Sequence, residues 1–190
     1  MLVAISGAQG SGKSTVLSKI KQMGYNTVDR KTSRSILSDW DVSLQEVNNN
    51  PQLTVRFQEE IILRKFKDEQ DAIDSKELWF TERSYIDLLT YSIVSLGKDN
   101  DYSPWINEYA KKCISLHQEY NLVFYIQSGF FNPEHDGVRG SNQFYSRMVD
   151  LTMSDLLYQN TLPTKLIGIE TPQIDQRVFQ IITMSESALL

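Results

Sequence analysis

The chain has 190 residues, which fits one domain, and its 41% hydrophobic and 23% charged residues are typical of a globular protein. The formal net charge of -5 disfavours a general binder of nucleic acid or of anionic membranes, although it leaves room for a local basic patch. The single cysteine, Cys113, excludes an internal disulfide framework and a multi-cysteine zinc site, and it is typical of a reducing compartment. No apolar run approaches the roughly 20 residues that span a bilayer. We therefore expect one soluble domain over residues 1–190, without a membrane partner, in the cytoplasm (of the host if the source is viral).

Short apolar segments alternate with helical patterns along the chain, which predicts βαβ units and a mainly parallel sheet. Their continuous apolar character suits strands that are covered on both faces. The expected strands are Leu2–Ser6, Tyr25–Asp29, Leu78–Glu82, Leu122–Gln127 and Lys165–Ile169.

Apolar residues recur at helical spacing between these strands. Asn50 followed by Pro51 predicts a helix start, because asparagine caps a first turn and proline needs no amide partner there. Before the last strand, Phe144, Met148 and Leu151 form an apolar stripe that predicts a helix with one packing face.

The strongest motif is Gly7–Thr15, which matches G-x-x-x-x-G-K-[ST] in full, directly after the first strand and at the start of a helix. Glycines allow successive backbone amides to turn around phosphate oxygens, and the helix start favours an anion. We expect Lys13 to act in catalysis by bridging the β- and γ-phosphates, and Ser14 to offer a hydroxyl to Mg²⁺. The residues expected to bind ATP are Gly7, Gly10, Ser11, Gly12, Lys13, Ser14 and Thr15.

Two carboxylates stand at strand ends, where an open parallel sheet binds its ligands. Asp29 ends the second expected strand and Glu82 ends the third. Phosphoryl transfer to a hydroxyl uses Mg²⁺ with oxygen ligands and a carboxylate near the attacking oxygen. If the third strand neighbours the first, Glu82 could hold Mg²⁺ or accept the acceptor's proton, with Asp29 farther out toward the acceptor. The alternative for each is a capping or salt-bridging carboxylate.

Basic residues follow the same strand ends. Arg83 could hold oxygens of the acceptor or of the γ-phosphate, so we count it as a candidate catalytic residue. Arg30, Lys31 and Arg34 cluster after the second strand and could bind an acceptor phosphate. The alternative for this cluster is an exposed, solvated helix start.

The segment Ser128–Asn142 contains three glycines and is long for a simple connection, so it is a candidate lid that extends to about residue 160. Arg139 lies within it and Arg147 on the helix that follows. An arginine that closes onto the γ-phosphate would stabilise charge in the transition state. We expect Arg139 to act in catalysis and Arg147 to bind the nucleotide, while surface arginines remain the alternative.

Three stretches occur in an order that resembles the NadR/ribosylnicotinamide-kinase-like P-loop proteins, which are often labelled AAA-type ATPases. They are the phosphate loop, Phe80–Tyr91 and Asp136–Arg139. In that family the third strand ends in D/E-R, an aspartate and a tyrosine follow on the next helix, and a D-G-x-R lid follows the fourth strand. The run Glu82-Arg83-Ser84 also resembles a motif of deoxynucleoside kinases.

This resemblance implies a three-layer α/β P-loop fold with a five-stranded parallel sheet in the order 2-3-1-4-5. It also implies a kinase that uses ATP and Mg²⁺ to phosphorylate a nucleoside or a nucleoside monophosphate. A second hypothesis is a kinase for a hydroxyl on a phage DNA base, which the net charge of -5 disfavours. A third is a regulatory ATPase without a small acceptor, which would not need a basic acceptor cluster. The oligomeric state cannot be predicted from the sequence.

Overall fold

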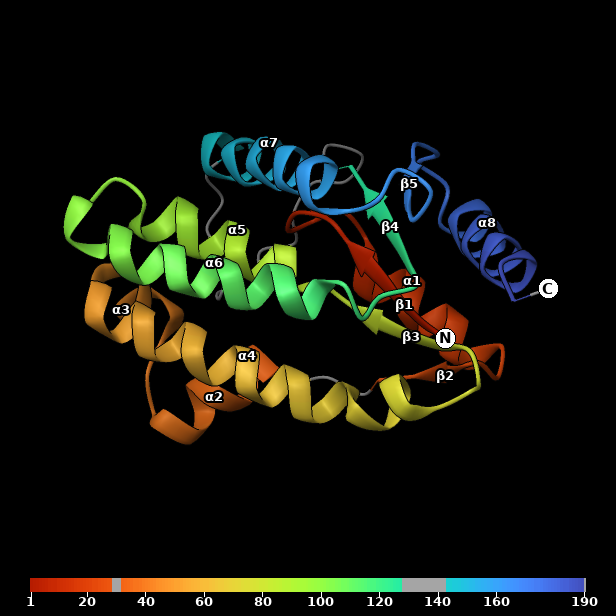
Figure 1. The fold of residues 1–190 in the computed structure, drawn as a ribbon, viewed down its shortest axis with the longest axis horizontal. Coiled ribbons are helices and arrows are strands. Elements are labelled where there is room, and N and C mark those ends of the chain that lie inside the picture. Colours follow the sequence, from red (N-terminus) through yellow and green to blue (C-terminus); the bar gives the residue numbers. More distant parts are fainter. Residues whose placement is uncertain (29–31, 128–142, 190) are drawn as a thin grey trace.

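The structure is a computed structural model of the chain, and it describes residues 1–28, 32–127 and 143–189. Five parallel strands form one sheet in the order β2-β3-β1-β4-β5, as the family resemblance implied (Figure 1). The strands are β1 (Leu2–Ser6), β2 (Asn26–Thr27), β3 (Trp79–Glu82), β4 (Leu122–Ile126) and β5 (Leu166–Ile169). The predicted bounds of β1, β3, β4 and β5 are correct to within one residue. The second strand is shorter than predicted, and Val28 continues its pairing with one more hydrogen bond, to Phe80 O at 2.9 Å.

Helices cover both faces of the sheet, which explains why its strands are apolar without alternation. On β1, Val3 and Ile5 pack into a core with α1 (Lys13–Gln22) and α8 (Ile174–Ser187), whereas Leu2 and Ala4 belong to a second core on the opposite face. Figure 1 shows the larger helical layer that closes this second core. Its long helices are α4 (Pro51–Asp74), α5 (Tyr85–Leu96), α6 (Ser103–His117) and α7 (Gln143–Asn160).

Shorter helices complete this layer. The helices α2 (Thr32–Trp40) and α3 (Leu44–Asn49) contact α4, and a 3-10 turn, η1 (Asn100–Tyr102), precedes α6. The helix α4 begins at Pro51 as predicted, and the side-chain oxygen of Asn50 accepts a hydrogen bond from Leu53 N at 3.1 Å. In the described parts of the chain, no helix combines the length and the apolar character that crossing a membrane requires.

The packing face predicted for α7 is wrong. Phe144, Met148 and Leu151 are exposed, and Phe144 retains 77% of its accessible surface. The buried face of α7 carries Val149, Met153 and Leu157 instead. Both sets have helical spacing, so the pattern predicts the helix correctly but cannot decide which face packs against the protein.

Candidate active site

The phosphate loop connects β1 to α1, and its backbone requires glycine at both ends. Gly7 has a φ of +152°, and a Cβ atom built there would lie 2.4 Å from Ile126 O. Gly12, at the N-cap of α1, has a left-handed φ of 90°. Because glycine has no side chain to cap the first turn, the amide donors of that turn are left for an anion.

Lys13 is the first residue of α1, and its side chain folds back over the loop. The ammonium donates to Ala8 O at 2.8 Å and to Ser11 Oγ at 3.2 Å. The side chain is nearly buried, with 5% of its surface exposed. The predicted phosphate-binding lysine is therefore already positioned by the loop that would hold the phosphates.

Ser14 and Glu82 meet across the junction of α1 and β3. Strand β3 pairs with β1 so that Glu82 stands opposite Ile5, and Ser14 Oγ donates to Glu82 Oε1 at 3.0 Å. A hydroxyl and a carboxylate oxygen are ligands that suit Mg²⁺. No group of three or more His, Cys, Asp or Glu side chains could hold a metal within the described ranges, so phosphate oxygens and water would have to complete the ligand set.

Asp87 ties the start of α5 to this edge of the sheet. Its Oδ2 accepts from the backbone N and from the hydroxyl of Ser84, both at 2.9 Å, which caps the helix. Its Oδ1 accepts a longer bond of 3.4 Å from Gly7 N. This buried carboxylate therefore links the residues after β3 to the first glycine of the phosphate loop.

Arg177 supports the phosphate loop from the side of α8. Its side chain is fully buried, and Nη1 donates to Ser11 O at 2.5 Å while Nε donates to Thr171 O at 2.6 Å. Burial lowers the pKa of Arg177 below its ordinary value. The place of Arg177 was not predictable from the sequence, because an arginine one turn into a C-terminal helix has no pattern that separates it from a surface residue.

A cleft of about 1180 Å³ opens beside the phosphate loop, between α5 and the group formed by α2, α3 and α4. Gln9 of the loop lines it, together with Arg83, Tyr91 and Tyr145. The volume is slightly above the range of about 300–1,000 Å³ that is typical of small-molecule sites. The cleft and the phosphate loop are therefore neighbouring parts of one site.

Arg83 directly follows β3 and presents its guanidinium to this cleft. Its Cζ lies 5.1 Å from the centre of the Tyr91 ring, a cation-π distance. Burial lowers the pKa of Arg83, but Tyr91, Glu82 and Asp87 together outweigh it and the pKa lies above its ordinary value. Arg83 therefore carries a permanent positive charge at the wall of the cleft.

Gln58 is a cleft residue that no sequence motif indicates. It lies on the buried face of α4, and its Oε1 is buried without a hydrogen-bond partner among the described residues. A buried amide oxygen without a partner is costly unless a ligand satisfies it. A glutamine in a helix normally lies on the surface. Only the helical spacing of Gln58 from the buried residues Thr54, Ile61 and Lys65 indicates that it lies on the inner face of α4.

Several predicted residues lie outside the described part of the chain. Asp29 and Arg139 are among them, with the whole lid candidate Ser128–Asn142; the others are Arg30 and Lys31. Arg34 is described and borders the cleft. Residues 143–160 of the predicted lid form the helix α7, on which Arg147 is exposed and lies 3.9 Å from Asp150 Oδ2.

Comparisons with solved structures show the same fold in known proteins. Deoxyadenosine kinase from M. mycoides with dCMP and a flexible dCDP bound matches with a TM-score of 0.74 and 15% identity over 98% of this chain and 100% of that one. The same kinase with bound dATP matches with a TM-score of 0.74, 15% identity, and 97% and 98% coverage. NadR in complex with NAD and AMP-PNP matches with a TM-score of 0.68 and 10% identity over 97% of this chain and 49% of that one. At these identities the likeness shows the fold.

The comparison with curated proteins found no match. A family model described as an AAA domain matches residues 2–177, a range that contains the phosphate loop, the Glu82-Arg83-Ser84 run and Arg177. Because this match covers most of the chain, the protein belongs to this AAA domain family.

Proposed function

We propose that the protein is an ATP-dependent phosphotransferase that moves the γ-phosphate of ATP to a hydroxyl or phosphate of a nucleoside or nucleoside monophosphate. The observation that carries this proposal is that the phosphate loop borders the 1180 Å³ cleft, because Gln9 of the loop lines it together with Arg83. A regulatory ATPase without a small acceptor needs a phosphate loop but does not need a second cavity beside it.

Each described residue at this junction has a chemical role. The acceptor oxygen attacks the γ-phosphorus, the bond to the β–γ bridging oxygen breaks, ADP leaves, and the acceptor's proton passes to a carboxylate. Lys13 and Arg83 stabilise negative charge on the transferring group. Among the residues that the structure describes, Glu82 is the candidate for the proton acceptor. Asp29, which lies outside them, is the second candidate.

Ser14 and Glu82 would hold Mg²⁺, which neutralises phosphate charge when it is bound. We further propose that Arg139 supplies positive charge that stabilises the γ-phosphate in the transition state, and that Arg147 contributes to nucleotide binding. Both assignments rest on the sequence.

A nucleoside acceptor is supported by the lining of the cleft. Gln58 offers an unpaired amide oxygen, which suits an amino or ring N–H of a base, and Tyr91 and Tyr145 offer aromatic surface. Similar structures include a deoxyadenosine kinase, which favours a deoxyribonucleoside as the first acceptor to test. Arg34 at the rim could hold a phosphate if the acceptor is a monophosphate.

The test is an acceptor screen with γ-labelled ATP. The acceptors are the ribo- and deoxyribonucleosides, their monophosphates, ribosylnicotinamide, and duplex DNA with hydroxymethylated bases. We expect label to appear on a nucleoside or a monophosphate, and Lys13→Ala protein to give no product. Label on DNA would favour the base-kinase alternative, and release of free phosphate with every acceptor would favour the regulatory ATPase.

Gln58→Leu gives the control for the acceptor side. This change replaces the amide with an apolar side chain of similar size, so the shape of the cleft is preserved. We expect it to raise the KM for the best acceptor and to leave the KM for ATP unchanged. The assignment of the cleft to the acceptor fails if the two constants change together.

A further inference from the structure

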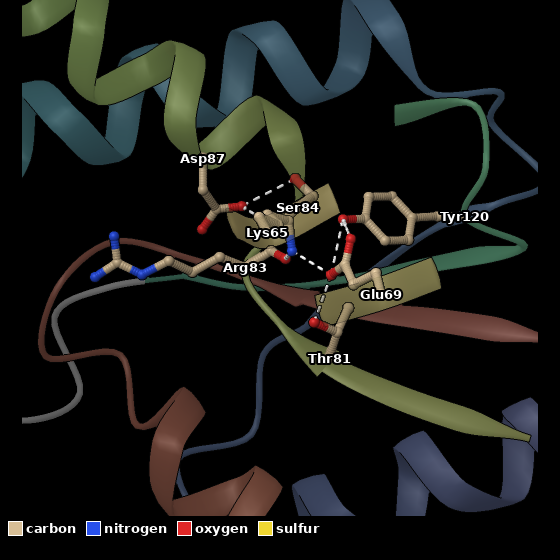
Figure 2. A network of polar contacts seen from close by, with 7 residues as sticks. All are labelled: Lys65, Glu69, Thr81, Arg83, Ser84, Asp87 and Tyr120. Carbon is tan, nitrogen blue, oxygen red and sulfur yellow. Dashed lines mark hydrogen bonds and ion pairs between the residues drawn. The ribbon is translucent and has the colours of Figure 1, made fainter. Parts of the chain in front are cut away.

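A buried ion pair lies behind the cleft. Lys65 and Glu69 are one turn apart on α4, their charged ends are in contact, and neither side chain is exposed. Glu69 also accepts from Thr81 Oγ1 at 2.6 Å and from Tyr120 OH at 3.0 Å, so hydroxyls from β3 and from the segment before β4 satisfy its oxygens (Figure 2). The carboxylate is therefore fixed by three elements of the fold.

Lys65 makes contacts beyond this pair. Its ammonium lies 5.1 Å from the centre of the Tyr85 ring and 5.6 Å from that of Tyr120. It also donates to the backbone carbonyl of Arg83 at 2.9 Å. This bond carries the network from the interior of α4 to the residue that enters the cleft.

The backbone of Arg83 has a conformation that must be held in place. Its φ is 67°, in the left-handed region that residues with a Cβ atom rarely adopt. Its amide donates to Ile5 O at 2.9 Å, and its carbonyl accepts from Lys65. The next residue, Ser84, is fixed by Asp87 at the start of α5. Both peptide groups of Arg83 are thus tied to buried partners.

This backbone sets the direction of the Arg83 side chain. Figure 2 shows the side chain of Arg83 leaving the network and pointing away from Lys65 and Glu69. It reaches the ring of Tyr91 and lines the cleft. If Arg83 relaxed to a negative φ, its Cβ would point elsewhere and the guanidinium would leave this position.

We propose that the buried pair of Lys65 and Glu69 is a positioning unit, which holds the Arg83 carbonyl and thereby aims the Arg83 guanidinium into the cleft. A buried ion pair is weak evidence for stability, because well-packed apolar side chains often stabilise a core as well. An apolar pair, however, could not donate a hydrogen bond to the Arg83 carbonyl, as Lys65 does. The proposal rests on the proposed function only where it concerns turnover.

The principal variant is Lys65→Met/Glu69→Gln, which removes both charges together and leaves no unpaired ion in the core. The amide oxygen that this variant places at position 69 can still accept from Thr81 and Tyr120. Lys65→Met/Glu69→Met is the second variant, for use if the first does not fold. Leu157→Ala is the matched control, because it opens a core cavity on α7 outside this network.

The first readout is independent of activity. In a ¹⁵N spectrum of the arginine Nε–H groups, the Arg83 signal is the one that disappears in the Arg83→Lys variant. The ring-current shift of this signal is the change in its position in the Tyr91→Leu variant. We expect the Arg83 signal of the double variant to move to the position of exposed arginines, while Leu157→Ala keeps the wild-type position. A wild-type Arg83 signal in a folded double variant overturns the proposal.

The second readout is a double-mutant cycle on turnover, with deoxyadenosine or the best acceptor of the screen. We expect the double variant to lower kcat/KM for the acceptor at least tenfold, with the KM for ATP within twofold of wild type. In an Arg83→Gln background, the same two substitutions should lower kcat/KM for the acceptor by less than twofold. An equal loss in both backgrounds overturns the proposal. If no acceptor is phosphorylated, the proposed function fails while the arginine spectrum still decides this one.

Discussion

The hydroxyl of Ser14 donates to Glu82 Oε1 at 3.0 Å, so the first turn of α1 and the end of β3 meet at one polar point. This contact joins the phosphate loop to the strand end that carries the candidate carboxylate. We expect Glu82→Gln to lower turnover by about 10²–10⁴-fold if Glu82 accepts the proton. If Glu82 serves the metal instead, the variant should need more Mg²⁺ and recover turnover at saturation.

A Mg²⁺ titration at saturating ATP separates these two roles. Ser14→Ala is the comparison, because it removes the hydroxyl without touching the carboxylate and should raise only the Mg²⁺ requirement. Wild-type turnover and Mg²⁺ dependence in Glu82→Gln would remove Glu82 from the reaction and leave Asp29 as the carboxylate to test.

Lys13 offers the sharpest test of the phosphate loop. Its ammonium lies against Ala8 O and Ser11 Oγ, within the loop that would surround the phosphates. We expect Lys13→Ala to reduce turnover by several orders of magnitude and to leave the circular dichroism spectrum unchanged, since the lost charge acts on the transition state. Lys21→Ala, which removes an exposed lysine from the same helix, is the control. Substantial activity in folded Lys13→Ala protein would refute the assignment.

Arg177 should matter for ATP although it stands behind the loop. Arg177→Met removes the donors to Ser11 O and Thr171 O, and the buried Ser11 carbonyl left without this partner costs about 1–3 kcal/mol. We expect a lower free energy of unfolding and a raised KM for ATP, with the KM for the acceptor less affected. Urea unfolding and initial rates measure both.

Arg56→Met is the control for Arg177, because it removes an exposed arginine of α4 that lies over Trp40. An Arg177→Met protein with a normal KM for ATP would show that the loop keeps its shape without this support.

The parts of the fold that were predictable from sequence depend on local patterns. The phosphate loop, the start of α4 at Pro51 and four of the five strands follow from spacing and composition. The face of α7 did not follow, because Phe144 and Val149 both belong to helical stripes and only the tertiary structure selects between them.

For the candidate site, the position of a residue was predictable where it stands next to the phosphate loop or at a strand end. Ser14, Glu82 and Arg83 fall into this class, and the structure places them at one junction. Gln58 and Arg177 were not predictable, since each reaches the site from a helix remote in sequence and has a polar side chain that usually faces solvent.

His117 should make stability depend on pH. It ends α6, is buried, and its Nε2 lies 2.8 Å from Thr161 Oγ1. Burial lowers the pKa of His117 from 6.5 to about 4, and the nearby Lys65 and Lys165 add to this effect while Asp87 opposes it. The native state thus holds a neutral imidazole that the unfolded chain would protonate below about pH 6.5.

The sign of the effect follows from proton linkage. Between about pH 6.5 and pH 4 the unfolded state binds more protons at this site, so the free energy of unfolding falls as the pH falls. We expect a loss of about 2 kcal/mol from this group between pH 8 and pH 5. His117→Gln keeps a polar partner for Thr161 but cannot titrate, so the difference between the two proteins isolates the imidazole from the carboxylates. Urea unfolding at pH 8, 6.5 and 5 measures it, and parallel curves for the two proteins would mean that His117 is protonated in the native state as readily as in the unfolded one.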